Sequence, residues 1–244
     1  MPFDIDQAVL QMRTMARIVE DPRGGPMRRI INGRHYKPTG RYSSTKARRS
    51  LPWEDKRERT YFWHCEADTN VVAYLSQPHR LELEIGRACP LIYFPDVRRD
   101  MADGRVEIRE IKKAYNPKED PNYDWKLQLA AEVYRGLGWS FRIIEAPEIE
   151  RRPGHDTVWA IQRYRHVAVT VQDRFAVMET VEHHNGIAAF GQVADALGGG
   201  PAGEARLCAC IVRRIASIDC TARLEPNSPV TLVAGHYDAL HRLR

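Results

Sequence analysis

The chain has 244 residues, a length that allows one large domain or two small ones. Its hydrophobic content of 43% and charged content of 28% are ordinary for a soluble globular protein. No apolar run approaches the roughly 18 residues of a membrane span, and the first residues lack the basic and apolar regions of a signal peptide. The five scattered cysteines form neither a disulfide framework nor a zinc knuckle, so we expect reduced cysteines and a cytoplasmic protein.

The first part of the chain predicts two helices separated by a basic arm. Apolar residues at helical spacing predict an amphipathic helix over residues 4–20, which the segment DPRGGP ends. The basic arm that follows has little periodicity. Pro52 suits the first turn of a second helix, which we expect over residues 52–66. The residues of this helix expected to face a core are Trp53, Tyr61, Phe62 and Cys65.

A series of short strands comes next. Two are expected over residues 71–78 and 80–86, and two more are joined by the turn Met101–Gly104. Apolar patterning on both sides of this turn predicts a β-hairpin. Residues 121–138 predict a helix, and residues 139–147 predict another strand. This order of elements indicates an α/β or α+β domain up to about residue 150.

Beyond that point the pattern changes to short helices. Three of them followed by a hairpin favour a winged helix-turn-helix, so we expect two domains, residues 1–150 and 151–244. The expected segments are a connecting helix at 155–167, three helices at 171–186, 188–199 and 201–220, and a strand, turn and strand at 220–235. Either phosphate contact or protein binding suits the last helix. The arginines that would contact phosphate there are Arg206, Arg213 and Arg214.

Positive charge is concentrated between Arg28 and Arg59. This stretch carries eleven lysines and arginines and three acids, so it contributes +8 to a net charge of +5 and leaves −3 for the rest. Such a local excess suggests a polyanion partner, and the interleaved aromatic and small polar residues suit an arm that contacts DNA phosphates. A solvated basic loop is the alternative. The DNA-binding residues predicted on this arm are Lys37, Arg41, Lys46, Arg48 and Arg49.

Two acids and a lysine lie in and beside the predicted hairpin. Residues two apart in a strand point to the same face, so Glu110 and Lys112 project together, while Ile111 turns away with its carbonyl available. Asp96 lies on the neighbouring strand. Two carboxylates and a carbonyl form an oxygen-rich pocket suited to Mg²⁺, and Lys112 would orient a water nucleophile or stabilise phosphoryl charge. A plain surface salt bridge is the alternative.

The letters PD at 95–96 and EIK at 110–112 follow the motif of the PD-(D/E)xK nuclease fold. In this fold an upstream helix often supplies another metal-binding carboxylate, and Glu54 and Glu58 lie in such a helix. Glu54 equally suits an acid that favours the helix dipole. Gln77 is a further candidate, with a backbone hydrogen bond at a strand end as its alternative role.

Residues 30–150 resemble the TnsA endonuclease family of heteromeric transposons. By this resemblance Glu58 is the helix glutamate that serves the metals, and Asp96 is the strand acid. Glu110 and Lys112 correspond to the E/Q-x-K pair, in which some members carry glutamine at the first position. The other positions that match the family's order and spacing are Lys37, Thr39, Gly40, Arg41, Glu54, Arg59, Asp68, Val71, Gln77 and Pro78.

The resemblance implies a restriction-endonuclease-like mixed sheet flanked by helices, followed by a winged-helix-like C-terminal domain. It implies Mg²⁺-dependent hydrolysis of DNA at the 5′ ends of a transposon, with Mn²⁺ able to substitute. The expected partners are double-stranded DNA, a DDE-type transposase subunit that cuts the 3′ ends and an AAA+ ATPase regulator that docks on the nuclease, and no membrane is expected. A stand-alone restriction or repair nuclease and an inactive DNA-binding adaptor are the alternatives.

Overall fold

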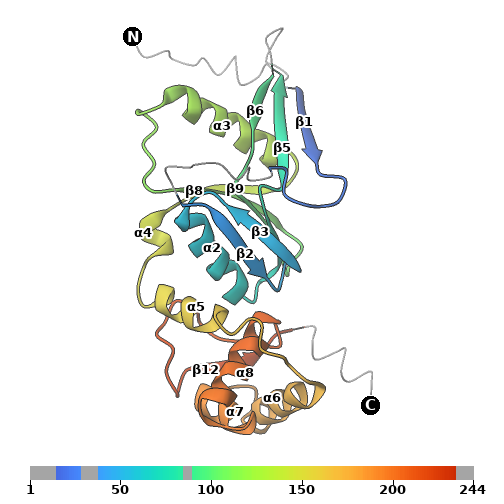
Figure 1. Cartoon of the computed structure of the whole chain (residues 1–244), viewed down its shortest axis with the longest axis vertical. Helices are drawn as coiled ribbons and strands as arrows, with labels where there is room; N and C mark the ends of the chain where they lie inside the picture. Colours follow the sequence, from blue (N-terminus) through green and yellow to red (C-terminus); the bar gives the residue numbers. More distant parts are fainter. Residues whose placement is uncertain (1–14, 29–37, 85–89, 235–244) are drawn as a thin grey trace.

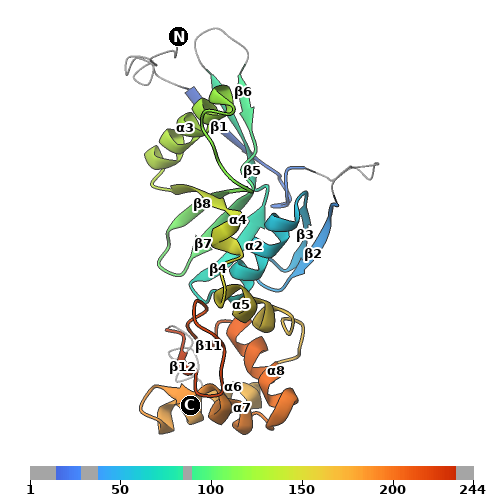
Figure 2. The same cartoon turned by 90° about the vertical axis from the view of Figure 1, so that its left-hand side faces the viewer.

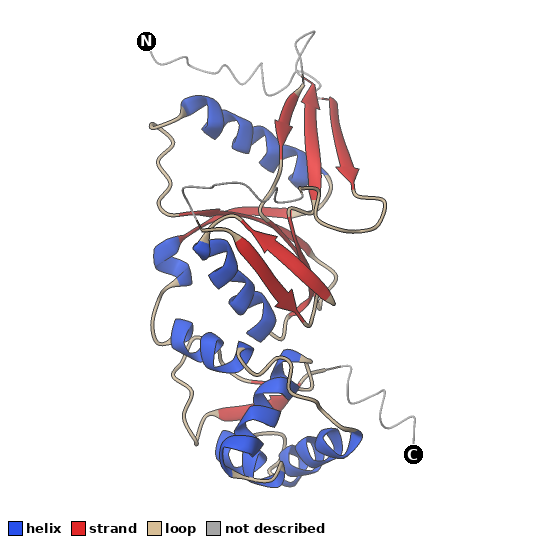
Figure 3. Ribbon diagram, viewed as in Figure 1, coloured by secondary structure: helices blue, strands red, loops and turns tan. Residues whose placement is uncertain are grey.

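The computed structural model describes residues 15–28, 38–84 and 90–234 of a mixed α/β chain with several sheets. The elements are stacked in three tiers along the long axis (Figure 1). A small sheet and one helix form one end, a larger sheet with a helix and a hairpin forms the middle, and a mainly helical part forms the other end (Figure 3). No helix within the described ranges is long and apolar enough to cross a membrane.

A four-stranded mixed sheet in the order β4-β7-β8-β9 forms the middle tier. β4 (Val71–Ser76), β7 (Val97–Met101) and β8 (Val106–Lys112) pair antiparallel in that order, whereas β9 (Ser140–Glu145) runs parallel to β8. β7 and β8 form a hairpin whose turn spans residues 102–105. The hairpin prediction is therefore confirmed.

The end tier is a three-stranded antiparallel sheet with a helix packed on it. β1 (Met15–Glu20), β5 (His79–Glu84) and β6 (Leu91–Tyr93) lie in the order β1-β5-β6. Helix α3 (Pro121–Gly136) contacts β5 and β6. The buried residues that join the helix to the strands are Leu81, Leu83, Tyr93, Leu127, Ala130 and Tyr134.

The prediction of a helix over residues 4–20 is wrong for its last part. Residues 15–20 form β1, and each of them pairs with a residue of β5. Pairing along the edge of β5 satisfies the backbone groups of the segment, and this long-range gain outweighs the local helical spacing. Residues 4–14 lie outside the described part of the chain.

The basic arm contains a β-hairpin of its own. β2 (Gly40–Ser44) pairs with β3 (Arg49–Trp53) over five residue pairs, so the arm is regular where little periodicity was expected. Tyr42, Leu51 and Trp53 are buried in a cluster with residues of the next helix. This burial explains the hairpin, because the aromatic and apolar side chains of both strands share one side.

Helix α2 (Lys56–Ala67) begins four residues later than predicted. Asp55 caps it, because the carboxylate accepts a hydrogen bond from the Arg57 N–H at 2.8 Å. Pro52 belongs to β3 and not to the first helical turn. The four residues predicted to face a core are all buried, namely Trp53, Tyr61, Phe62 and Cys65.

The C-terminal part has short helices and a small antiparallel sheet in the order β10-β12-β11. The predicted third helix ends at Val212 and not at residue 220, and Arg214 follows with a positive φ of 59°. The elements are α4 (Ala146–Ile149), α5 (Gly154–Gln162), α6 (Val171–His183), β10 (Ala188–Ala189), α7 (Phe190–Ala196), α8 (Gly200–Val212), β11 (Ala216–Ser217) and β12 (Pro229–Leu232). Of the strands expected in residues 220–235 only the second is formed in the described part of that range, as β12, and it pairs antiparallel with β11, which ends at Ser217.

The C-terminal part packs on the end of α2, with α5 beside that helix (Figure 2). One hydrophobic cluster joins Ala67, the last residue of α2, to Val158 of α5 and Leu207 of α8. The Arg214 Nε atom donates a hydrogen bond to the Thr69 carbonyl at 2.7 Å. The division at residue 150 stays a prediction, because the core of the C-terminal helices continues into α2.

Candidate functional site

The last residues of β8 present the predicted acid and lysine together. The Lys112 Nζ atom lies 2.7 Å from the Glu110 Oε1 atom. Ile111, between them, points the other way and is buried beside Ile144 in the hydrophobic cluster that includes Phe62 of α2. The alternation expected of a strand therefore holds at this position.

Asp96 lies immediately before β7 and contacts the backbone of β8. Its Oδ2 atom accepts a hydrogen bond from the Ile111 N–H at 2.6 Å. Continuing the register that pairs Val97 with Arg109 places Pro95 opposite Ile111. Proline has no N–H, so this position offers the Ile111 carbonyl no ladder donor. The predicted aspartate and the predicted carbonyl thus meet at the end of the hairpin.

Glu110 is almost fully buried, with 2% of its surface exposed, and two tyrosines hold its carboxylate. The Tyr93 hydroxyl on β6 donates to Oε2 at 2.6 Å, and the Tyr123 hydroxyl on α3 donates to Oε1. Tyr123 also accepts a hydrogen bond from the Lys112 Nζ atom at 2.9 Å. The spacing of residues in the sequence gives no sign of these tyrosines, because β6 and α3 bring them in from separate segments.

Glu58 lies in the first turn of α2 and is buried. Its Oε2 atom accepts a hydrogen bond from the Glu54 N–H at 3.0 Å. Burial raises the pKa of Glu58 to about 7; the Glu54 N–H opposes this rise, and the charges of Glu54, Asp55 and Glu110 add to it. The charge of Glu110 is among those that raise the pKa of Glu58, and α2 packs beside β8.

The Asp96 carboxylate is strongly affected by its surroundings. Burial raises the pKa of Asp96 well above its usual range, and the charges of Glu110 and Glu58 raise it further. The Ile111 N–H and the Lys112 charge oppose that rise. The three carboxylates therefore repel one another, and the Lys112 charge offsets part of this repulsion at Asp96.

The donor set fits a hard divalent cation by its chemistry. Carboxylates of Asp96, Glu110 and Glu58 and the Ile111 carbonyl are oxygen ligands of the kind that Mg²⁺ takes. A cation would also relieve the repulsion that raises the pKa values of Asp96 and Glu58. Among the described residues, however, no three histidine, cysteine, aspartate or glutamate side chains form a ready-made metal group. Metal binding would therefore require side-chain rearrangement, most directly at Glu110, whose oxygens are held by Tyr93 and Tyr123.

Two further candidates lie beside the carboxylates. The Gln77 Nε2 atom donates to Glu54 Oε1 at 3.0 Å, and the Gln77 N–H donates to the Asp96 carbonyl at 2.8 Å. Gln77 has a positive φ of 44°, and its buried Oε1 atom has no partner among the described residues. The structure thus brings Gln77 and Glu54 next to Asp96 and Glu58.

The predicted DNA-binding residues divide into separate groups. Lys37 lies outside the described residues. Arg41, Arg48 and Arg49 are exposed on the β2–β3 hairpin. Lys46, in the turn between β2 and β3, is half-buried, and its part in DNA binding stays a prediction.

Lys46 closes the C-terminal end of α2. Its Nζ atom donates to the Cys65 carbonyl at 2.8 Å and to the Asp68 carbonyl at 2.6 Å. Burial lowers the pKa of Lys46 to about 8, while the charges of Glu66 and Asp68 oppose that shift. The free carbonyls of a helix end attract a cation, so this lysine serves the fold.

The arginines at the end of α8 also bond within the chain. Arg206 donates to the Leu197 carbonyl at 2.9 Å, and Arg213 donates to the Ala209 carbonyl at 3.0 Å. Arg214 bonds to Thr69, as described above. These contacts do not favour the expectation that the three arginines hold phosphate.

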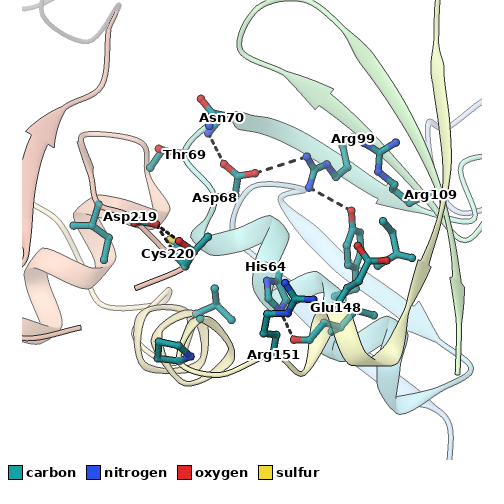
Figure 4. A pocket seen from close by; sticks show the side chains of 18 of the residues that line it. His64, Asp68, Thr69, Asn70, Arg99, Arg109, Glu148, Arg151, Asp219 and Cys220 are labelled. Atoms are coloured by element: carbon teal, nitrogen blue, oxygen red, sulfur yellow. Dashed lines mark hydrogen bonds and ion pairs between the residues drawn. The ribbon is translucent and has the colours of Figure 1, made fainter. Parts of the chain in front are cut away.

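A cleft of about 710 Å³ lies between the middle tier and the C-terminal part (Figure 4). Arg99 and Arg109 line it from β7 and β8, and each has a guanidinium nitrogen 2.7 Å from Glu107 Oε2. Asp68 lies 3.7 Å from Arg99 (Figure 4). Arg109 alternates with Glu110 along β8, so this cleft opens on the other face of the sheet from the carboxylate site. Nothing in the sequence pointed to it.

Comparison with known proteins yields no relative, since no family model matches the chain and no curated protein matches it at a significant level. The resemblance to the TnsA family therefore rests on the motif residues named above. The geometry around Asp96 and Glu110 is independent of that resemblance, and it carries the functional argument.

Proposed function

We propose that the chain is a metal-dependent DNA endonuclease subunit of a heteromeric transposase that hydrolyses phosphodiester bonds at the 5′ ends of a transposon. One observation carries this proposal: the end of the β7–β8 hairpin brings together Asp96, Glu110 and the Ile111 backbone, with Lys112 alongside. Such an arrangement of two acids, a carbonyl and a lysine suits metal-assisted phosphodiester hydrolysis.

The architecture supports a PD-(D/E)xK restriction-endonuclease-like assignment. The sheet is mixed, Asp96 directly precedes β7, and Glu110 and Lys112 end β8. Helix α2, which packs beside β8, supplies a buried glutamate, Glu58, in its first turn. These are the relative positions that the motif predicts.

The chain's own residues have separate roles in the proposed reaction. Asp96, Glu110, Glu58 and the Ile111 carbonyl would hold Mg²⁺, for which Mn²⁺ would substitute. The chemistry that the bound ion supplies is polarisation of the scissile phosphate and a lower pKa for the attacking water. Lys112, held beside Glu110, orients that water and stabilises the charge that develops on the phosphoryl group.

The C-terminal part supports a winged-helix assignment and a role in docking. Its order α6, β10, α7, α8, β11, β12 and its sheet order β10-β12-β11 suit a winged helix in which α8 would be the recognition helix. Residues 207–212 of α8 are buried, and the helix contacts α2 and α5. A helix face buried in this way is not free to enter a DNA groove. We therefore assign this part to the proposed partners, the AAA+ regulator and the DDE-type transposase subunit.

A cleavage assay with transposon-end DNA and the partner subunits tests the proposed function. Asp96→Asn should abolish 5′ cutting in Mg²⁺ and in Mn²⁺, because a metal ligand is lost. Asp100→Asn is the matched control, since Asp100 lies on β7 as well but pairs with Arg98 at the strand surface. Cutting by the Asp96→Asn variant at the wild-type rate would overturn the proposal.

A further inference from the structure

A small pocket of about 200 Å³ lies where the segment 21–28 meets the β2–β3 hairpin. Its lining contains four arginines and one acid, Asp21, so positive charge is concentrated in a small volume. We call it the arginine pocket, after Arg23, Arg28, Arg41 and Arg49. The sequence predicted phosphate contacts for the hairpin arginines, but not that the turn before the arm joins them.

The pocket is built by contacts between the two segments. The Arg49 Nη1 atom donates a hydrogen bond to the Gly24 carbonyl, which ties the hairpin to the turn. A Cβ atom at Gly25 would lie 3.4 Å from the same nitrogen, so the guanidinium lies directly beside the backbone of the turn. Within the described ranges, neither Arg23 nor Arg41 forms an ion pair.

Arg28 connects the arginine pocket to the carboxylate site. Its Nη1 atom lies 3.8 Å from Glu54 Oε2, and Glu54 donates its N–H to Glu58. The Arg28 guanidinium also lies over the Phe94 ring, 4.3 Å from the ring centroid, and Phe94 is two residues before Asp96. Arg28 therefore lies between the arginine pocket and the segments that carry Glu58 and Asp96.

We propose that the arginine pocket binds one backbone phosphate of the DNA strand whose neighbouring phosphodiester is cut at Asp96 and Glu110. This inference rests on the proposed function and adds how the strand is placed. The planar forks of arginine match phosphate oxygens in pairs. The carboxylates of the metal site repel a polyanion when they are ionised, and the arginines beside them offset that repulsion for a strand that passes from one to the other. Arg28 is the residue that both sites share.

A double-mutant cycle on Arg23 and Arg41 tests whether two segments hold one phosphate. Binding of a short fluorescent DNA duplex is measured by anisotropy over a series of salt concentrations, without divalent metal. Neither side chain makes an ion pair within the described part of the chain, so Arg23→Ala and Arg41→Ala should leave the thermal melt unchanged. Each variant should weaken binding about tenfold, which corresponds to loss of a charge-assisted hydrogen bond.

The double variant distinguishes a shared phosphate from two separate ones. If one phosphate is shared, the double variant should also bind about tenfold more weakly than wild type, not a hundredfold, and the log–log salt slope should fall by about 0.9. Additive losses with a slope change of about 1.8 would show separate phosphates and overturn the proposal. Unchanged binding would overturn it as well. Arg105→Ala with Arg135→Ala is the matched control, because both arginines are exposed and ion-paired elsewhere.

Two further features of the experiment distinguish DNA phosphate from free phosphate, and failure of this inference from failure of the proposed function. Inorganic phosphate, exchanged for chloride at constant ionic strength, should compete with DNA for the wild type and lose this effect in the double variant. Phosphate binding that leaves DNA binding unchanged would overturn the assignment to a DNA strand. Because binding is measured without metal, loss of the nuclease assignment at Asp96 would leave these results interpretable.

Discussion

Asp96 accepts a hydrogen bond from the Ile111 backbone N–H at 2.6 Å, so one side chain serves both the β7–β8 hairpin and the candidate metal site. The same carboxylate is raised in pKa by burial and by the charges of Glu110 and Glu58. Different substitutions of Asp96 therefore distinguish its hydrogen bond to the Ile111 backbone from its proposed role as a metal ligand.

Asp96→Ala should lower stability as well as abolish cutting. Loss of the acceptor leaves the Ile111 N–H without its partner, which costs about 1–3 kcal/mol for a buried donor. Asp96→Asn keeps a carbonyl oxygen at this position, so it should abolish cutting with a smaller loss of stability. Urea unfolding of both variants measures the difference. Equal stability of the two would show that the hydrogen bond contributes little to the fold.

Stability should depend on pH through Glu58. Its folded pKa of about 7 lies above the ordinary carboxyl value, so the protonated form stabilises the fold below about pH 4.5 and this contribution is lost as pH rises through 7. At 1.36 kcal/mol per pKa unit, the loss amounts to about 3 kcal/mol. Glu58→Gln should therefore be more stable than wild type at pH 8 and of similar stability at pH 4.

Urea unfolding at the two pH values checks this prediction, with Glu132→Gln on the exposed face of α3 as the control. A Glu58→Gln variant whose stability follows the wild type at both pH values would show that folding does not raise the pKa of Glu58. Added Mg²⁺ at pH 8 should stabilise the wild type more than the variant, because an ion offsets the ionised carboxylates.

Tyr123→Phe should strengthen metal binding. The Tyr123 hydroxyl donates to the Glu110 Oε1 atom, and a hydrogen bond to a charged group is worth about 1.5–3 kcal/mol. Removing it frees that oxygen, so Mn²⁺ should bind about tenfold more tightly by isothermal titration calorimetry. Tyr115→Phe is a matched control, since the Tyr115 hydroxyl bonds to Asp124 instead. Weaker Mn²⁺ binding by Tyr123→Phe would mean that the hydroxyl orients Glu110 for the metal and does not compete with it.

Lys46→Met should affect folding and not DNA binding. The variant loses the cation that holds the Cys65 and Asp68 carbonyls at the end of α2, so its free energy of unfolding should fall by about 1–3 kcal/mol. Its affinity for duplex DNA should match that of wild type in the anisotropy assay. A loss of affinity with unchanged stability would restore Lys46 to the set of phosphate contacts.

Local periodicity accounts for the part of the site that was predictable. The two-residue repeat of a strand placed Glu110 and Lys112 on one side, and the turn at residues 101–104 paired their strand with the one beside Asp96. Both inferences need only neighbours along the chain, and the structure has these residues in contact. The buried face of α2 was predictable for the same reason.

The remaining features depend on contacts between distant segments. Tyr123 reaches Glu110 because α3 packs against β9, the neighbour of β8, and Gln77 reaches Glu54 because the end of β4 lies beside the start of α2. The strand β1 exists because β5 has a free edge, which local helical spacing does not reveal. Lys46 carried the charge expected of a DNA contact, but a helix end binds its ammonium. Charge and spacing alone do not distinguish these outcomes.

Anomalous X-ray diffraction from crystals soaked in Mn²⁺ tests most directly whether Asp96 and Glu110 hold a divalent metal ion. We expect an anomalous peak bounded by the carboxylates of Asp96 and Glu110 and the Ile111 carbonyl. The Glu110 side chain should have moved away from the Tyr123 hydroxyl. The peak should vanish in Asp96→Asn crystals soaked in the same way. At saturating Mn²⁺, no peak at this position, with Glu110 still bonded to Tyr93 and Tyr123, would contradict the account.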